Sequence, residues 1–143
     1  MKITSKFTVA VHTLLVIYVF GKEYKTTSEF IASSVNVNPV VIRRTLQSLK
    51  AAGIVDVKAG SGGARITKEL KDITLYDIYQ AVECVEAGLF NFHENPNPNC
   101  PVGRNIHTLL DGHLISAQTA MENYLRSVTL AELAKQCDDC VRK

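Results

Sequence analysis

Two basic segments of this chain carry side chains that could read the edges of DNA bases. Arg43 and Arg44 can each offer paired donors to guanine or hold phosphates, and Gln47 can pair with an adenine edge. Further along, Gly60-Ser61-Gly62-Gly63-Ala64-Arg65 ends in an arginine that could enter a minor groove or contact the backbone. Amides at helix starts and nearby lysines would hold phosphates. The predicted DNA interface therefore comprises Thr27, Ser28, Asn38, Val40, Arg43, Arg44, Gln47, Lys50, Ser61, Gly62 and Arg65.

Four cysteines could supply a second kind of chemistry. Cys137-Asp138-Asp139-Cys140 has the spacing of a redox dithiol or of half a zinc site, but two aspartates are a poor setting for a reactive thiolate. Cys84 lies between valines and is expected to pack in the core. Cys100 is the better redox-sensor candidate because its proline-rich loop should be exposed. We expect no metal site.

Two short helices and a hairpin would position the basic residues. Thr26-x-x-Glu29 predicts a capping box at the start of one helix. Asn38 as N-cap and Pro39 at the first helical position predict the next helix, which Gly53 ends. That helix would bury Ile42, Leu46 and Leu49 and leave its basic face outward. Residues 54–59 and 64–68 predict two strands joined at the glycines, and residues 5–20 predict a buried first helix.

The back half of the chain is predicted to be helical. Thr74 begins a second capping box and a helix to about Glu86, whereas residues 91–103 hold three prolines and predict a loop. Residues 104–126 predict a helix roughly 30 Å long, which favours pairing across a two-fold axis. The predicted dimerisation residues are Ile106, Leu109, Leu110, His113, Ala117, Met121 and Tyr124. Thr129 would cap a last helix.

The distribution of charge separates the two halves. Residues 1–68 carry 10 Lys and Arg against 3 Asp and Glu, a balance of +7, whereas residues 69–143 carry 6 against 11, or −5. This asymmetry indicates a front half that binds a polyanion. The apolar run at residues 8–20 is shorter than the roughly 20 residues that span a bilayer, so we expect no membrane contact and a cytoplasmic location.

These patterns predict a mainly α fold with a small β-wing. A winged helix-turn-helix domain would cover residues 1–86, an effector-type loop residues 87–103, and a dimerisation helix with a last helix residues 104–143. The predicted function is a sequence-specific DNA-binding regulator and not an enzyme. Two alternatives stay open: a thiol–disulfide redox protein using Cys137 and Cys140, and a winged-helix module that binds another protein.

Several segments together resemble the Rrf2 family of bacterial winged-helix transcription regulators, which includes IscR, NsrR and CymR. The segment from Glu94 to Gly103 is similar to the YwnA-like branch of that family. The matching segments are Asn38-Pro39-Val40-Val41-Ile42-Arg43-Arg44, Leu49-Lys50-Ala51-Ala52-Gly53-Ile54-Val55, Gly60-Ser61-Gly62-Gly63-Ala64-Arg65 and Ile73-Thr74-Leu75-Tyr76-Asp77-Ile78.

The resemblance implies a homodimer, joined through the long helix, that represses genes on a palindromic operator. It also implies an effector acting at the loop before that helix. Cluster-binding members have three closely spaced cysteines in this loop, whereas this chain has only Cys100 there, with His93 and His107 as the nearest other ligands. We therefore expect no iron–sulfur cluster and no other cofactor. Cys100 is the candidate for a response to oxidative or thiol stress.

Overall fold

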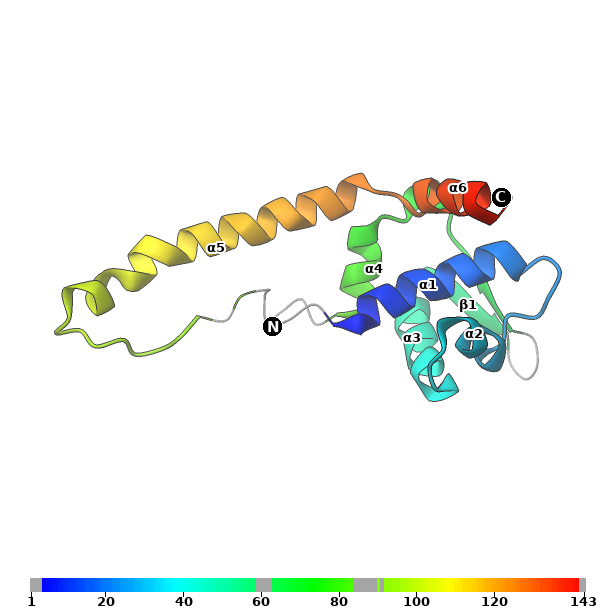
Figure 1. The fold of residues 1–143 in the computed structure, drawn as a ribbon, viewed down its shortest axis with the longest axis horizontal. Coiled ribbons are helices and arrows are strands. Elements are labelled where there is room, and N and C mark those ends of the chain that lie inside the picture. The colour runs from blue at the N-terminus through cyan, green and yellow to red at the C-terminus, as the bar shows by residue number, and fades with distance from the viewer. Residues whose placement is uncertain (1–3, 59–62, 84–89, 91, 142–143) are drawn as a thin grey trace.

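The computed structural model describes residues 4–58, 63–83, 90 and 92–141. It is mainly helical, with a two-stranded antiparallel sheet that forms the wing, as the sequence predicted. The first four helices and the sheet form a rounded head, from which α5 extends, and α6 lies back on the head (Figure 1). The elements are α1 Ser5–Phe20, α2 Ser28–Val35, α3 Pro39–Ala51, β1 Val55–Lys58, β2 Gly63–Ile66, the 3-10 helix η1 Leu70–Asp72, α4 Leu75–Val82, α5 Pro101–Ser127 and α6 Leu130–Val141.

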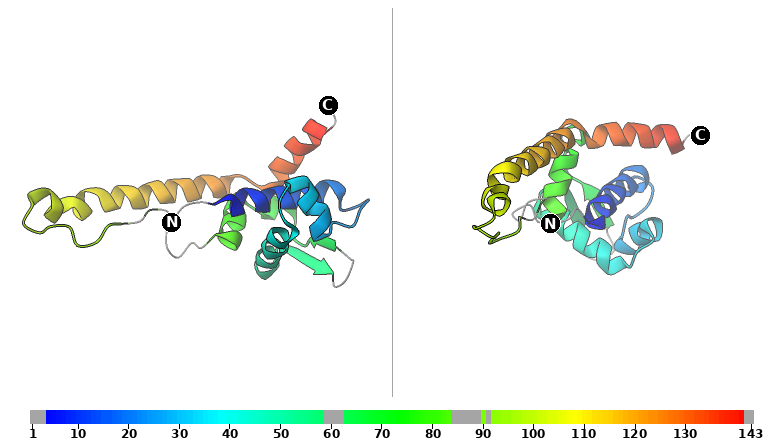
Figure 2. Two further views of the ribbon diagram at one scale, coloured as in Figure 1. Left: turned by 60° about the horizontal axis from the view of Figure 1, so that its bottom comes forward. Right: turned by 60° about the vertical axis from the view of Figure 1, so that its left-hand side comes forward.

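Helix α1 forms the centre of the head. It buries Leu14 and Ile17 and packs against α2, α3, α4 and α6, because it carries apolar residues on most of its surface. The predicted α3 stripe is confirmed, since Ile42, Leu46 and Leu49 are all buried. Helix α6 lies on the opposite side of α1 from α3 (Figures 1 and 2). The face of α3 that points away from α1 is therefore free of α6.

The predicted capping box at Thr26 is wrong. Thr27 is the N-cap of α2, and its hydroxyl accepts from the Phe30 amide at 3.2 Å. Thr26 is buried instead, and its hydroxyl donates to the Ala64 carbonyl at 2.6 Å. Glu29 is left free to reach α3. The cap lies one residue later because the Thr26 hydroxyl is already used in a buried hydrogen bond to the wing.

The start of α3 is confirmed in detail. The Asn38 side chain accepts from the Val40 amide at 2.9 Å, and Pro39 occupies the first turn. Before it, Asn36 takes the left-handed conformation at φ 65°, which ends α2 and turns the chain. The angle between α2 and α3 is thus fixed by local signals that the sequence displays.

The wing lies close against the loop that joins α1 and α2. Its strands pair from Val55 opposite Ile66 to Lys58 opposite Gly63. The Ala64 amide donates to the Thr26 carbonyl at 2.9 Å, beside the hydroxyl bond already described. A Cβ on Gly63 would lie 2.8 Å from the Thr26 nitrogen, so only glycine fits there, and its φ of 78° favours glycine as well. The wing tip at 59–62 lies outside the described residues.

The second capping box is confirmed, with Thr74 and Asp77 bonding each other's backbone amides at 3.1 and 3.0 Å. Helix α4 ends at Val82, earlier than predicted, because the next residue, Glu83, is extended at φ −106° and ψ 150°. Residues 84–86 of the predicted helix, including Cys84, lie outside the described residues. Thr129 caps α6 as predicted, by accepting from the Glu132 amide.

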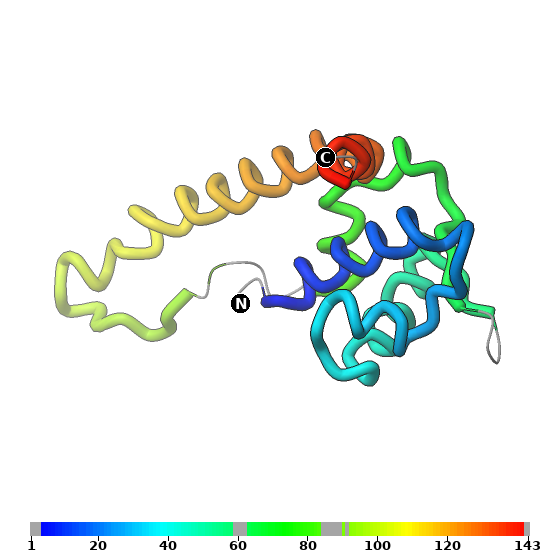
Figure 3. The backbone as a smooth tube through the Cα atoms, turned by 45° about the vertical axis from the view of Figure 1, so that its right-hand side comes forward, coloured from blue at the N-terminus to red at the C-terminus, as the bar shows by residue number. Residues whose placement is uncertain are grey.

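Helix α5 begins at Pro101, three residues before the predicted start, and runs to Ser127. The sequence interpretation assigned Pro101 to the loop, but proline at the first helical position costs no hydrogen bond and favours a helix start. Cys100 is consequently the N-cap residue of α5. Figure 3 shows α5 carrying the residues around its start far from the head.

Candidate nucleic-acid interface

The outward face of α3 presents polar and basic side chains around one valine. Since successive helix residues are about 100° apart, Gln47 lies about 20° to one side of Val40 and Arg44 about 40° to the other. All three residues are exposed. The predicted base-reading residues therefore share one surface, opposite the buried stripe.

The remaining predicted α3 residues lie at the edges of this face. Arg43 lies on the α2 side, where its guanidinium is 3.4 Å from the Glu29 carboxylate. Both side chains are more than half exposed, so this pair contributes little to stability and can open when phosphate competes. Lys50 is exposed on the same side of the helix. Arg43 and Lys50 thus lie at the α2 edge of the outward face, whereas Arg44 and Gln47 lie nearer its middle.

The opposite edge of the face is a small hollow beside α1 and α4. Its volume is about 260 Å³. Val41 and Ser48 line it from α3, and Lys6 and Val82 from the neighbouring helices, while Arg44 lies at its border. Arg44 can therefore reach either the base edges in front or the backbone to the side.

The helix starts predicted to bind phosphate are positioned for that role in part. Thr27 and Asn38 are the N-caps of α2 and α3 and already use their side chains to accept from Phe30 and Val40. At the start of α3, Pro39 has no amide hydrogen, and the Val41 amide donates to the Asn38 carbonyl at 2.9 Å. In the first turn of α2, the Ser28 and Glu29 amides lie outside the hydrogen-bond ladder of the helix. Ser28, in the first turn of α2, is half-buried. The N-terminus of α2 therefore offers amides to an anion, whereas that of α3 does not.

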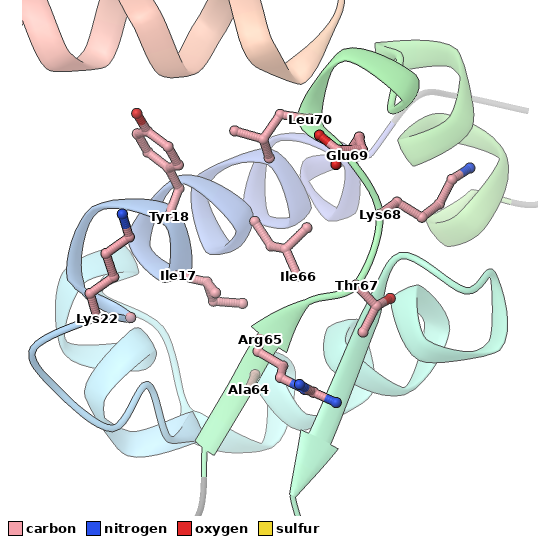
Figure 4. Close-up of a pocket in the computed structure, with 11 residues that line it drawn as sticks. Ile17, Tyr18, Lys22, Ala64, Arg65, Ile66, Thr67, Lys68, Glu69 and Leu70 are labelled. Atoms are coloured by element: carbon pink, nitrogen blue, oxygen red, sulfur yellow. The ribbon is translucent and has the colours of Figure 1, made fainter.

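Arg65 on β2 is exposed and only loosely paired, with its guanidinium 3.7 Å from the Asp56 carboxylate on the adjacent strand. It borders two hollows of about 520 and 720 Å³ that lie between the wing and the end of α1. Figure 4 shows Ile17, Ile66 and Leu70 among the residues around the first hollow, and the Arg65 guanidinium pointing away from these three side chains. Ser61 and Gly62 lie outside the described residues.

Sequence reasoning missed two lysines of this surface. Lys22 and Lys25, in the loop between α1 and α2, line the second hollow together with Lys58 and Arg65. The hydrogen bonds between Thr26 and Ala64 bring this loop beside β2. Because Thr26 and Ala64 are 38 positions apart, no local pattern reveals the contact. The run of charges at 22–25 was the one available signal.

Helix α5 carries a stripe of apolar residues that the described part of the chain leaves uncovered. None of its residues is buried. Leu109 and Tyr124 are 61% and 67% exposed, and Leu110, His113 and Ala117 are exposed too. Ile106 and Met121, also predicted for the dimer, are half-buried at the stripe's edge.

Cys100 and two histidines lie around the start of α5. The backbone amides of Gly103 and Val102, in the first turn of α5, lower the pKa of the Cys100 thiol from its ordinary value. His107 Nδ1 is 2.9 Å from an Asp111 carboxylate oxygen, and the His93 ring centroid is 5.3 Å from that of His107. Cys100 is half-buried, so it stays accessible to small oxidants.

The Cys137 and Cys140 thiols lie on α6, at the other end of α5. Cys137 is half-buried and Cys140 exposed, and both are free. Between them, Asp138 accepts from the Tyr18 hydroxyl at 2.7 Å and ties α6 to α1. This segment therefore has an evident packing role.

A helix-turn-helix with an exposed basic face, followed by a wing, defines the class of winged-helix nucleic-acid-binding proteins. The family model described as "Iron-dependent Transcriptional regulator", named Rrf2, matches residues 3–136. The chain belongs to the Rrf2 family of transcriptional regulators and is not an enzyme, which rules out the redox-enzyme alternative.

The chain is similar to known proteins along nearly its whole length. It is 47% identical to the "Putative HTH-type transcriptional regulator YwnA" of Bacillus subtilis, over 92% of this chain and 96% of that protein. A crystal structure of a "putative DNA binding protein" is 41% identical, with a TM-score of 0.71, over 90% of this chain and 98% of that one. CymR, the global cysteine regulator of B. subtilis, shares the fold at 23% identity and a TM-score of 0.69, over 95% and 98% of the two chains.

The family description raises the question of iron. Within the described residues, no group of three or more His, Cys, Asp or Glu side chains is arranged to hold a metal ion. Clusters are usually held by several thiolates, and Cys100 lies at the opposite end of α5 from Cys137 and Cys140. The donors described here do not fit an iron–sulfur cluster. Among the same residues, no helix has the length and apolar content needed to cross a membrane.

Proposed function

We propose that this protein is a homodimeric repressor that binds a palindromic DNA operator in the cytoplasm. The exposed face of α3 carries the proposal, because Arg44 and Gln47 lie on it and are exposed. The first turn of α2, which packs against α3, adds amides that could hold a phosphate. Arginine and glutamine are side chains that pair with guanine and adenine in the major groove. Arg65 and the lysines around it would follow the backbone on the wing side.

The apolar stripe of α5 supports the dimer. A second copy of the same helix would cover Leu109, Leu110 and Tyr124, which are exposed in the single chain. A two-fold dimer would present two α3 helices to successive major grooves. The half-sites would then lie about 34–36 Å apart, one turn of the duplex.

Cys100 is proposed as the redox sensor of this dimer. Its thiolate would attack peroxide, forming a sulfur–oxygen bond as the O–O bond breaks, which gives a sulfenic acid and releases hydroxide. The Gly103 and Val102 amides stabilise the charged thiolate, and the neutral sulfenic acid would lose this stabilisation. The first turn of α5 would then rearrange. Movement of α5 would shift the two α3 helices out of register. We propose that no iron–sulfur cluster takes part.

Fluorescence anisotropy tests the DNA-binding proposal. Purified protein is titrated onto labelled DNA from upstream of its own gene, with an unrelated duplex as control. We expect specific binding that weakens steeply with salt, and loss of the preference in the Gln47→Ala variant. Lys135→Ala on α6 is the matched control and should bind as the wild type does, since α6 lies across α1 from α3. Equal affinity for both duplexes would contradict the proposal.

The same assay with reduced and peroxide-treated protein tests the switch. Wild-type protein should release the operator on oxidation, whereas Cys100→Ser should stay bound. Release that persists in Cys100→Ser would exclude this sensor while leaving the regulator intact.

A further inference from the structure

Val40 is an apolar side chain in the middle of a polar surface. It occupies the first turn of α3 and is 41% exposed, with Arg44 and Gln47 as its neighbours on the outward face. The described hydrophobic core and the residues packed against it do not include Val40. On the outward face of α3, which is proposed to bind DNA, the Val40 side chain therefore cannot form a hydrogen bond.

Helix formation gives no reason for a valine at this position. Asn38 and Pro39 already start α3, and its packing rests on Ile42, Leu46 and Leu49 on the other side. Valine is a poorer helix former than alanine because its branched side chain restricts χ1. Val40 is thus exposed at the front of the helix start and is available to contact a partner outside the chain.

The DNA major groove offers one apolar group at the base edges, the C5-methyl of thymine. Residues near the start of a recognition helix are the ones that meet base edges. Resting on the DNA-binding function proposed above, we infer that Val40 recognises a thymine in each half-site through its methyl group. Arg44 and Gln47 then read the hydrogen-bonding edges of neighbouring pairs, since Gln47 lies about 10 Å along the helix from Val40, roughly three base-pair steps.

Val41 provides a matched comparison within the same turn. It is also a valine, and at 39% its exposure is nearly equal. About 100° round the helix from Val40, it faces the hollow shared with Lys6 and Val82 and not the front. Val41→Ala removes about as much exposed apolar surface as Val40→Ala does. It should nevertheless leave base recognition intact.

The test begins with selection of binding sites from a random duplex library by the full-length protein. Each thymine of the selected half-site is then replaced by deoxyuridine, which lacks only the methyl group, and affinities are compared by anisotropy. We expect one thymine whose replacement weakens wild-type binding about fourfold, the factor for burying one methyl group, and roughly fifteenfold when both half-sites are changed. Val40→Ala should bind thymine and deoxyuridine sites equally, while Val41→Ala keeps the wild-type difference.

The outcomes separate this inference from the function on which it rests. A selected motif that contains no thymine, or one in which no replacement matters, overturns the Val40 assignment and leaves the regulator standing. A thymine preference lost in Val41→Ala and kept in Val40→Ala also overturns it. Failure to select any motif overturns sequence-specific binding itself. Thermal melting of both variants should match the wild type, because both side chains are exposed.

Discussion

The contact between the wing and the α1–α2 loop can be tested with two glycines. Gly63 and Gly53 both have φ 78°, but a Cβ would meet the Thr26 backbone nitrogen at 2.8 Å only at Gly63, whereas nothing lies within 4 Å of it at Gly53. Gly53→Ala therefore isolates the cost of the left-handed conformation. Gly63→Ala adds the displacement of the wing from Thr26.

The expected magnitudes follow from these differences. Left-handed strain in Gly53→Ala should lower the free energy of unfolding by about 1 kcal/mol after the lower entropy of the unfolded chain is counted. Gly63→Ala should carry the same strain and should also break the two hydrogen bonds between Thr26 and Ala64, which contribute about 1 kcal/mol each. The free energy of unfolding should therefore fall by about 3 kcal/mol.

Urea denaturation at one fixed protein concentration measures both variants, because the stability of a dimer depends on concentration. DNA affinity, measured well below the melting temperature, should fall in Gly63→Ala and stay unchanged in Gly53→Ala. Equal losses of stability in the two variants would refute the idea that close contact with Thr26 holds the wing in place.

Three further expectations concern the dimer, the backbone contacts and the thiol. Leu110→Glu should give monomers by sedimentation, because it charges the exposed stripe of α5, while Thr108→Glu on the other side should not. Lys25→Ala should lower the log–log salt slope of DNA binding by about 0.9, the value for one phosphate contact, and Lys135→Ala should leave the slope unchanged. Iodoacetamide should label Cys100 with a pH midpoint lower in the folded protein than in urea, because backbone amides lower its pKa when folded; equal midpoints by mass spectrometry would contradict this.

The sequence alone determined the elements whose signals are local. Asn38 and Pro39 predicted the start of α3, and Thr74 with Asp77 predicted that of α4, because a cap binds an amide only two or three residues away. The stripes of α3 and α5 were readable as well, since their spacing follows the helix period. These signals established the fold and most of the outward face of α3.

Only the tertiary structure decided which residues those elements bring together. Thr26 seemed to cap a helix, but its partner is the Ala64 carbonyl of the wing, 38 positions away. This contact places Lys22 and Lys25 beside Arg65, and the packing of α2 on α3 places Glu29 beside Arg43. Spacing along the chain placed Val40 on the outward face, but only the packing of α1 and α4 beside α3 shows that Val41 lines a hollow. Hydrogen bonds and packing between distant segments leave no periodic pattern in the sequence. They can therefore be identified only in the folded structure.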